Sequence, residues 1–279
     1  MEKASMKVFN RLTMLTVASA IALGLASGAV YAKPKGNKSS NSHAHQCDGL
    51  PTHADLLQAL DAAVATETSG LDFEMWATVV NRDGRVCAVA FSGANRGSQW
   101  PGSRVISAQK ANTANSFSLD GLALSTANLY SAVSPGGSLY GLQHSNPVDT
   151  AVAYGDNGHA GGNAKRYGQP NDPLVGDFVG GVNVFGGGLG LYNGSIIGGL
   201  GVSGDTSCAD HMIAWRTRDN LGLDNLSSVN GVANPPTHPD NIIYDITSQA
   251  GQQEGVSAGG FGHPTCLNTA DETTLPAVQ

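Results

Sequence analysis

The feature that most constrains the fold is a glycine-rich stretch in the second half of the chain, from Gly180 to Gly204. Within it, two short apolar runs flank the dipeptide Asn193-Gly194. Asn-Gly tolerates the two positive φ angles that a type I′ turn requires, so the pattern predicts a β-hairpin with this turn. The surrounding glycines lack Cβ atoms and let backbone or a ligand approach the strands closely. The stretch therefore predicts paired strands that help to build a site.

The N-terminus is typical of a secretory signal peptide. Three basic residues, Lys3, Lys7 and Arg11, precede an uncharged run over residues 12–32. The run ends in Val30-Tyr31-Ala32, with small residues at the two recognition positions. We expect cleavage after Ala32 and a periplasmic or secreted mature protein without a membrane span. The alternative is an uncleaved membrane anchor, because the run is long enough to cross a bilayer.

Four cysteines follow the predicted signal peptide: Cys47, Cys87, Cys208 and Cys266. An even number in an exported chain predicts two disulfides. Three pairings are possible, and the spacing favours Cys208–Cys266, which leaves Cys47–Cys87. The sequence contains no C-x-x-C-H motif, which excludes a covalently attached c-type haem. The formal net charge of −7 and the lack of a basic stripe argue against nucleic acid as a partner.

The chain divides into four predicted regions: a signal peptide at 1–32, a flexible leader at 33–52, a domain at 53–224 with a loop insertion at 145–177, and an extended C-terminal arm at 225–279. Apolar periodicity and stop signals predict helices at 55–68, 107–117, 125–133 and 209–221. Strands are predicted at 73–80, at 85–91 and on both sides of Asn193-Gly194. Antiparallel strands with helices between them indicate an α+β fold rather than a doubly wound sheet.

Several segments occur in the order found in one known family. They are Leu56–Ala63, Val80–Val86, Ser107–Ala114, Gly180–Gly188 and Gly199–Gly204. The third is similar to the pattern A-x-x-K-A-x-T-A. Together they resemble the GlcG/HbpS-like family, whose domain also forms the C-terminal part of PduO-type proteins, over roughly residues 53–144 and 178–224. The chain departs from that pattern in its expanded loop, its C-terminal arm and the segment Cys208–His211, where a carboxylate pair is more usual.

The resemblance implies a profilin-like α-β-α fold, with an antiparallel sheet flanked by helices, and assembly into a homo-oligomer. It also implies non-covalent binding of a small-molecule ligand, haem or a related tetrapyrrole. The ligand-binding residues would be Lys110, Thr113, Gly186, Gly187 and Gly188, in a pocket between the lysine helix and the glycine-rich strands. An ammonium group there can pair with a propionate. The alternative for Lys110 is a solvated helix face.

Histidines are the candidate metal ligands. His211 lies in the last predicted helix, and its imidazole is a competent ligand for iron or zinc. The alternative is a helix-surface histidine near a disulfide. His144 and His159 flank the long loop and offer a second candidate site, with ordinary solvated loop histidines as the alternative.

Catalytic motifs are missing from the sequence. Gly201-Val202-Ser203-Gly204 does not match G-x-S-x-G, and there is neither a Walker lysine nor an H-E-x-x-H motif. We therefore predict no catalytic residue and favour an exported haem-binding protein. Two other functions remain open. One is an enzyme for a small organic acid, with Lys110 and the amides of Gly187 and Gly188 as an anion clamp. The other is a structural oligomeric scaffold.

Overall fold

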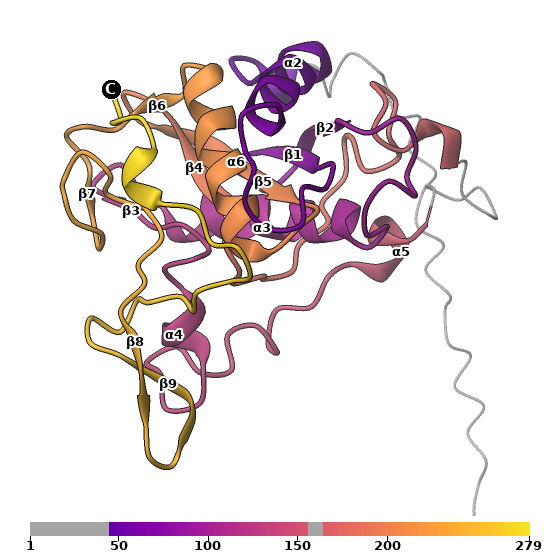
Figure 1. Ribbon diagram of the computed structural model, residues 1–279. Helices are drawn as coiled ribbons and strands as arrows, with labels where there is room; N and C mark the ends of the chain where they lie inside the picture. The colour runs from indigo at the N-terminus through magenta and orange to yellow at the C-terminus, as the bar shows by residue number, and fades with distance from the viewer. Residues whose placement is uncertain (1–44, 156–163) are drawn as a thin grey trace, which may run out of the picture. The chain divides into compact units, whose positions relative to one another are not determined.

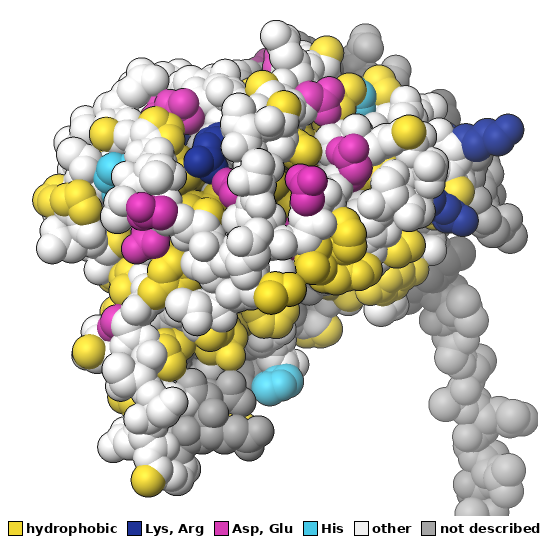
Figure 2. All heavy atoms as spheres, viewed as in Figure 1, with side chains coloured by type: hydrophobic (Ala, Val, Ile, Leu, Met, Phe, Trp, Pro, Cys, Tyr) yellow, Lys and Arg dark blue, Asp and Glu magenta, His cyan; other side chains and the backbone are white. Residues whose placement is uncertain are grey.

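The structure is a computed structural model that describes residues 45–155 and 164–279 (Figure 1). The predicted signal peptide and most of the predicted leader lie outside these residues, as does His159. Among the described residues, no helix is long and apolar enough to span a bilayer. On the face shown in Figure 2, Lys and Arg side chains are few and well separated.

A five-stranded sheet forms the centre of the fold, in the order β2-β1-β5-β4-β6. Its strands are β1 (Trp76–Asn81), β2 (Val86–Phe91), β4 (Gly188–Asn193), β5 (Ile196–Ser203) and β6 (Asp224–Asn225). Neighbouring strands are antiparallel except β4 and β6, which are parallel. The predicted α+β class is thus confirmed.

Helices cover both faces of this sheet (Figure 1). The helices α2 (His53–Val64) and α6 (Ser207–Asn220) pack on one face, and α3 (Ser103–Phe117) packs on the other. Alternate residues of β1 face opposite layers, so that Ala77 joins the cluster with α2 and α6, whereas Trp76 joins the cluster with α3. Because both faces are buried, the central strands are largely apolar, and the one polar residue in the middle of β1, Thr78, is hydrogen-bonded to Ser107.

Glycines allow α3 to lie directly on β4 and β5. A Cβ added to Gly201 would overlap the carbonyl oxygen of Ser107 and the amide nitrogen of Ala111. A Cβ on Gly199 would overlap the carbonyl oxygen of Ala111, and one on Gly188 would lie 2.7 Å from the carbonyl oxygen of Lys110. The close approach predicted from the glycine-rich sequence is therefore an approach of helix backbone to sheet backbone.

The predicted hairpin forms, but its turn differs from the prediction. Tyr192 pairs with Ile196 after a register shift. Three residues therefore lie between these two partners, Asn193-Gly194-Ser195, although Asn193 still belongs to β4 through its pairing with β6. Gly194 has φ +77°, whereas Asn193 is not among the residues with positive φ. A type I′ turn needs positive φ at both central residues, so the predicted turn type is wrong.

Three predicted helices appear with shifted ends, and one is mostly lost. The predictions at 55–68, 107–117 and 209–221 correspond to α2, α3 and α6, the last capped by Thr206 and followed by Gly222 at φ +63°. The prediction at 125–133 is reduced to α4 (Tyr130–Val133). Polar side chains explain the loss, because Thr126 donates to the carbonyl oxygen of Phe185 and Asn128 donates to that of Asn241.

The remaining elements are short. They are η1 (His45–Cys47), β3 (Leu122–Ala123), α5 (Thr150–Ala153), η2 (Ala164–Arg166), β7 (Asn230–Gly231), β8 (Ile246–Gln249), β9 (Gln252–Ser257) and η3 (Glu272–Thr274). The C-terminal segment returns to the domain, where the indole nitrogen of Trp215 donates to the carbonyl oxygen of Pro276 at 2.9 Å. Leu275 and Val278 join the same hydrophobic core as α2 and α6.

Both disulfides form with the favoured pairing. Cys47 is bonded to Cys87 and Cys208 to Cys266, and all four cysteines are therefore oxidised. The first bond links the segment before α2 to β2. The second links the first turn of α6 to the C-terminal segment.

Candidate functional site

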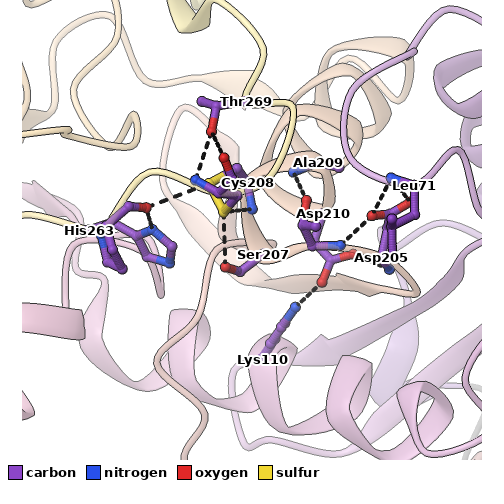
Figure 3. Close-up of a disulfide and its surroundings, with 12 residues drawn as sticks. Leu71, Lys110, Asp205, Ser207, Cys208, Ala209, Asp210, His263 and Thr269 are labelled. Carbon is purple, nitrogen blue, oxygen red and sulfur yellow. Dashed lines mark hydrogen bonds and ion pairs between the residues drawn. A yellow bond between two sulfur atoms is a disulfide. The ribbon is translucent and has the colours of Figure 1, made fainter.

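Lys110 lies in the middle of α3, is 1 % exposed and points toward Asp210 of α6 (Figure 3). Its Nζ lies 2.6 Å from Oδ2 of Asp210 and donates to the carbonyl oxygen of Val202 at 3.1 Å. Gly187, at φ +113°, is adjacent, and a Cβ there would lie 3.1 Å from Nζ. The structure thus brings Lys110 and Gly187 together, and a carboxylate of the same chain neutralises the ammonium.

The carboxylate of Asp210 accepts hydrogen bonds from three donors. Besides Lys110, the backbone N–H groups of Gly204 and Asp205 donate to Oδ1 at 3.0 and 2.9 Å. Burial raises the pKa of Asp210 to about 6, although Lys110 and the two N–H groups act to lower it. Burial likewise lowers the pKa of Lys110, against the effect of Asp210. Because the contact is short and Oδ1 accepts two further hydrogen bonds, the charged pair is the favoured state.

The other predicted ligand-binding residues surround the same buried region. Thr113 donates to the carbonyl oxygen of Gln109 at 2.7 Å and accepts from the N–H of Asn183 at 3.0 Å. A Cβ on Gly186 would overlap the carbonyl oxygen of Ser207. These groups therefore already have partners within the chain, and contact with a ligand would require the packing around Lys110 to open.

His211 is fully buried in α6. Its Nε2 lies 3.1 Å from both Oδ1 of Asn241 and the N–H of Ile242. Its Nδ1 has no hydrogen-bond partner among the described residues. Burial lowers the pKa of His211 to about 3, although Asp240 and Asn241 act to raise it. The imidazole is therefore neutral at physiological pH. His144, by contrast, is exposed on the long loop.

The largest cavity of those described here lies elsewhere, beside the start of α2 and the edge strand β2. It has a volume of about 600 Å³ and includes the disulfide Cys47–Cys87 in its wall. The apolar part of its lining consists mainly of Leu50, Pro51, Ala88, Val89, Pro170 and Val175. His53, the first residue of α2, is the imidazole that faces it. Apolar walls with few polar groups are typical of small-molecule sites.

The hydrogen bond of His53 decides which of its nitrogens can bind a ligand. Its Nε2 lies 2.8 Å from the carbonyl oxygen of Gly168. A carbonyl oxygen only accepts, so Nε2 carries a proton, and in the neutral imidazole Nδ1 therefore holds the lone pair. Metal-binding histidines usually have this arrangement, in which one ring N–H is anchored by a carbonyl and the other nitrogen is free. His53 carries no signal in the sequence, because a histidine at the start of an amphipathic helix has the same local pattern as a solvated residue.

Two further cavities are less suited to a large ligand. One, of about 310 Å³, lies between Val232–Pro235, Ile242–Tyr244 and Glu272. The hydroxyl of Tyr244 is buried there without a partner among the described residues, and burial raises its pKa. The other, of about 440 Å³, lies between Tyr130–Ser138 and the β8–β9 hairpin and is lined mainly by serine and glycine. None of the ligand-binding or metal-binding residues predicted from the sequence lines any of these three cavities, although the predicted disulfide Cys47–Cys87 lines the largest.

The buried neutral state of His211 predicts a loss of stability in acid. Its pKa is about 3 in the folded protein and 6.5 when unperturbed, so unfolding takes up a proton between these values. Stability contributed by this group is complete above pH 6.5 and is lost as the pH falls toward 3. Asp210, whose pKa is raised, acts in the opposite direction between pH 3.8 and 6.

We expect His211→Gln to reduce the difference in unfolding free energy between pH 7 and pH 5 by about 1–2 kcal/mol. Urea unfolding at both pH values measures it. The variant His144→Gln, at an exposed histidine, serves as the control and should keep the wild-type pH dependence. An unchanged pH dependence in His211→Gln would show that another group controls acid stability.

A comparison with family models agrees with the resemblance drawn from the sequence. A family model described as "Haem degrading protein HbpS-like" matches residues 52–218, which is more than half of the chain. No curated protein shows significant sequence similarity to the chain. Among solved structures, the chain is similar to the Klebsiella pneumoniae protein ORFY, of family DUF336, with 26% identity and a TM-score of 0.39, over 61% of this chain and 90% of that one.

A second solved structure with similarity is a PduOC–haem complex. Its identity to the chain is 21%, with a TM-score of 0.40, and the match covers 60% of this chain and 89% of that one.

Proposed function

The chain belongs to the HbpS-like family of haem-degrading proteins, and from this premise we propose that it binds haem, or a closely related tetrapyrrole, without a covalent bond. The observation that carries this proposal is the family match over residues 52–218, which includes α2, α3 and the whole of β1, β2, β4 and β5. Haem bound to this protein would supply redox chemistry at its iron.

The His53 cavity, as defined above by its lining, fits a tetrapyrrole best. Its wall offers apolar surface for a planar ring, and its one imidazole has a free Nδ1 lone pair. The Gly168 carbonyl would hold the ring of His53 in place and raise the basicity of Nδ1. Pro170 and Val175, from the loop after η2, would exclude water from one side of the cavity.

The residues predicted from the sequence form a competing proposal. Lys110, Thr113, Gly186, Gly187 and Gly188 would contact the ligand, and His211 would bind its metal, only after the Lys110–Asp210 pair had opened. The 2.6 Å ion pair also weakens the anion-clamp alternative, because it occupies the ammonium that an organic acid would need. The His53 cavity requires no such rearrangement.

We predict that His53→Ala weakens haem binding at least about tenfold, because iron loses its imidazole ligand. Titration of the purified protein with haem, followed by the Soret band, measures this. The matched control is His144→Ala, which removes an exposed loop histidine and should bind as the wild type does. Thermal melts of both variants separate binding from folding. If His53→Ala kept wild-type affinity and Soret position, the His53 cavity would be rejected and the Lys110 region would become the leading site.

We also propose that the protein is exported, that it assembles into a homo-oligomer and that its fold is profilin-like. Two disulfides support export, since such bonds persist in oxidising compartments. Family membership supports the assembly and the fold type. If haem does not bind, we would instead propose that the protein is a structural oligomeric scaffold without a ligand.

A further inference from the structure

We propose that Cys208, Cys266 and His263 form a binding site for Zn²⁺ once the disulfide between the two cysteines has been reduced. A ring nitrogen of His263 and the two Sγ atoms all lie within 4.8 Å of one another. Two thiolates and an imidazole are a ligand set that zinc prefers, and three protein ligands leave one position open. Figure 3 shows the group between the first turn of α6 and the C-terminal segment.

His263 packs against Tyr130 and also presents a buried ring nitrogen that is available to a metal. It is 1 % exposed, and its Nδ1 donates to the carbonyl oxygen of Pro264 at 2.7 Å. Because a carbonyl cannot donate, this bond places the proton on Nδ1 and leaves the lone pair on Nε2. Nε2 has no hydrogen-bond partner in the described part of the chain. A buried nitrogen without a partner has lost its hydrogen bonds to water and has gained none in the protein, which costs free energy. A bound cation would offset this cost.

The surroundings of Cys266 favour a thiolate. The backbone N–H of Cys208 points at Sγ of Cys266 at 3.2 Å, and Oγ of Ser207 lies 3.5 Å from the same sulfur. Both groups belong to the first turn of α6, where the helix dipole favours negative charge. Sγ of Cys208 has a less favourable environment for a thiolate, because it lies 3.6 Å from the carbonyl oxygen of Pro264, as Sγ of Cys87 does from that of Arg85.

The half-buried position of Cys266 gives a reductant access, whereas Cys208 is fully buried. A dithiol or phosphine reductant supplies two electrons, the S–S bond breaks, and each sulfur becomes a thiol. Zn²⁺ then displaces one proton from each thiol, and both protons pass to solvent. Two Zn–S bonds of about 2.3 Å require the sulfurs to lie about 3.8 Å apart. The Cα atoms are 5.9 Å apart, which side-chain rotation can accommodate.

The experiment uses the full-length protein reduced with a phosphine and titrated with Co²⁺ as a spectroscopic substitute for Zn²⁺. We expect one Co²⁺ per chain, a thiolate-to-cobalt charge-transfer band, and displacement of that band by Zn²⁺. The oxidised protein should give no such band. His263→Gln should weaken Co²⁺ binding at least about tenfold, since it removes a ligand. Cys208→Ser combined with Cys266→Ser should abolish the band.

The matched control is Cys47→Ser combined with Cys87→Ser, which removes the other disulfide and should leave the band unchanged. Circular dichroism of the reduced protein with and without Co²⁺ reports folding. The proposal is overturned if the reduced, folded wild type gives no band, or if His263→Gln gives the same band and affinity. It is also overturned if reduction unfolds the chain and Co²⁺ does not restore the native spectrum.

Discussion

Gly201→Ala is expected to destabilise the protein by more than about 3 kcal/mol. The new Cβ would overlap the backbone of Ser107 and Ala111 and would lie 3.0 Å from Cβ of Lys110. Backbone atoms cannot rotate away as a side chain can, so α3 as a whole would have to move off the sheet. That movement would also expose part of the apolar cluster between α3 and β1. Urea unfolding monitored by circular dichroism gives the free energy.

Gly121→Ala is the matched control for this prediction. A Cβ at Gly121 meets no atom within 4 Å, and its φ angle is not in the positive region. We expect a change within about 0.5 kcal/mol. If Gly201→Ala unfolded at the same urea concentration as the wild type, the close contact of α3 with β5 would not exist in solution.

Lys110→Met is expected to cost about 3–5 kcal/mol, because it leaves Asp210 buried without the cation that stabilises its carboxylate. The loss should change little with salt, because a buried pair is poorly screened. This differs from the modest, salt-sensitive effect that a partly exposed lysine would show. The double variant Lys110→Met with Asp210→Asn should recover much of the loss, since asparagine can still accept from the N–H groups of Gly204 and Asp205.

Arg96→Met, at an exposed arginine, controls for the loss of a positive charge and should change stability by no more than about 0.5 kcal/mol. Thermal melts and urea titrations at low and high salt measure all three variants. If Lys110→Met were as stable as Arg96→Met, the pair would be exposed in solution. The lysine would then be free to meet a ligand, as the sequence pattern predicts.

These two predictions bear on where the ligand binds. A lysine that is needed for folding makes a poor test of binding, because its removal lowers the amount of folded protein. His53 is the better probe, since its cavity lies at the far end of α2 from the buried pair and its side chain is only half-buried. The two histidine sites are also independent, because His263 is fixed by the C-terminal segment and His53 by the loop around Gly168.

Local patterns were sufficient for the elements whose apolar periodicity agrees with their packing. The helices α2, α3 and α6 and the hairpin around Gly194 appear where the sequence predicts them, with ends displaced by a few residues. For the helices and the hairpin, the signal comes from residues near one another in the chain. Cysteine spacing favoured one disulfide pairing among three, and the structure has that pairing, with partners 40 and 58 positions apart.

The turn prediction fails for a local reason, because the register shift at Tyr192 leaves three residues between Tyr192 and its partner Ile196. The lost helix has a tertiary cause. The helix predicted at 125–133 is mostly lost because Thr126 and Asn128 donate to the carbonyls of Phe185 and Asn241, residues far along the chain. Such contacts outweigh local propensity when the side chains that make them are buried.

The sequence by itself determined the α+β class, the close approach at the glycines and the presence of two disulfides, because periodicity, missing side chains and an even number of cysteines are visible before folding. Only the tertiary structure decided that Lys110 is neutralised by Asp210, one hundred positions away. Only it decided that His53 faces a cavity and that His263 holds a free nitrogen beside a disulfide. The physical reason is that the charge state and accessibility of a side chain depend on the partners that folding places around it, and those partners lie on distant segments.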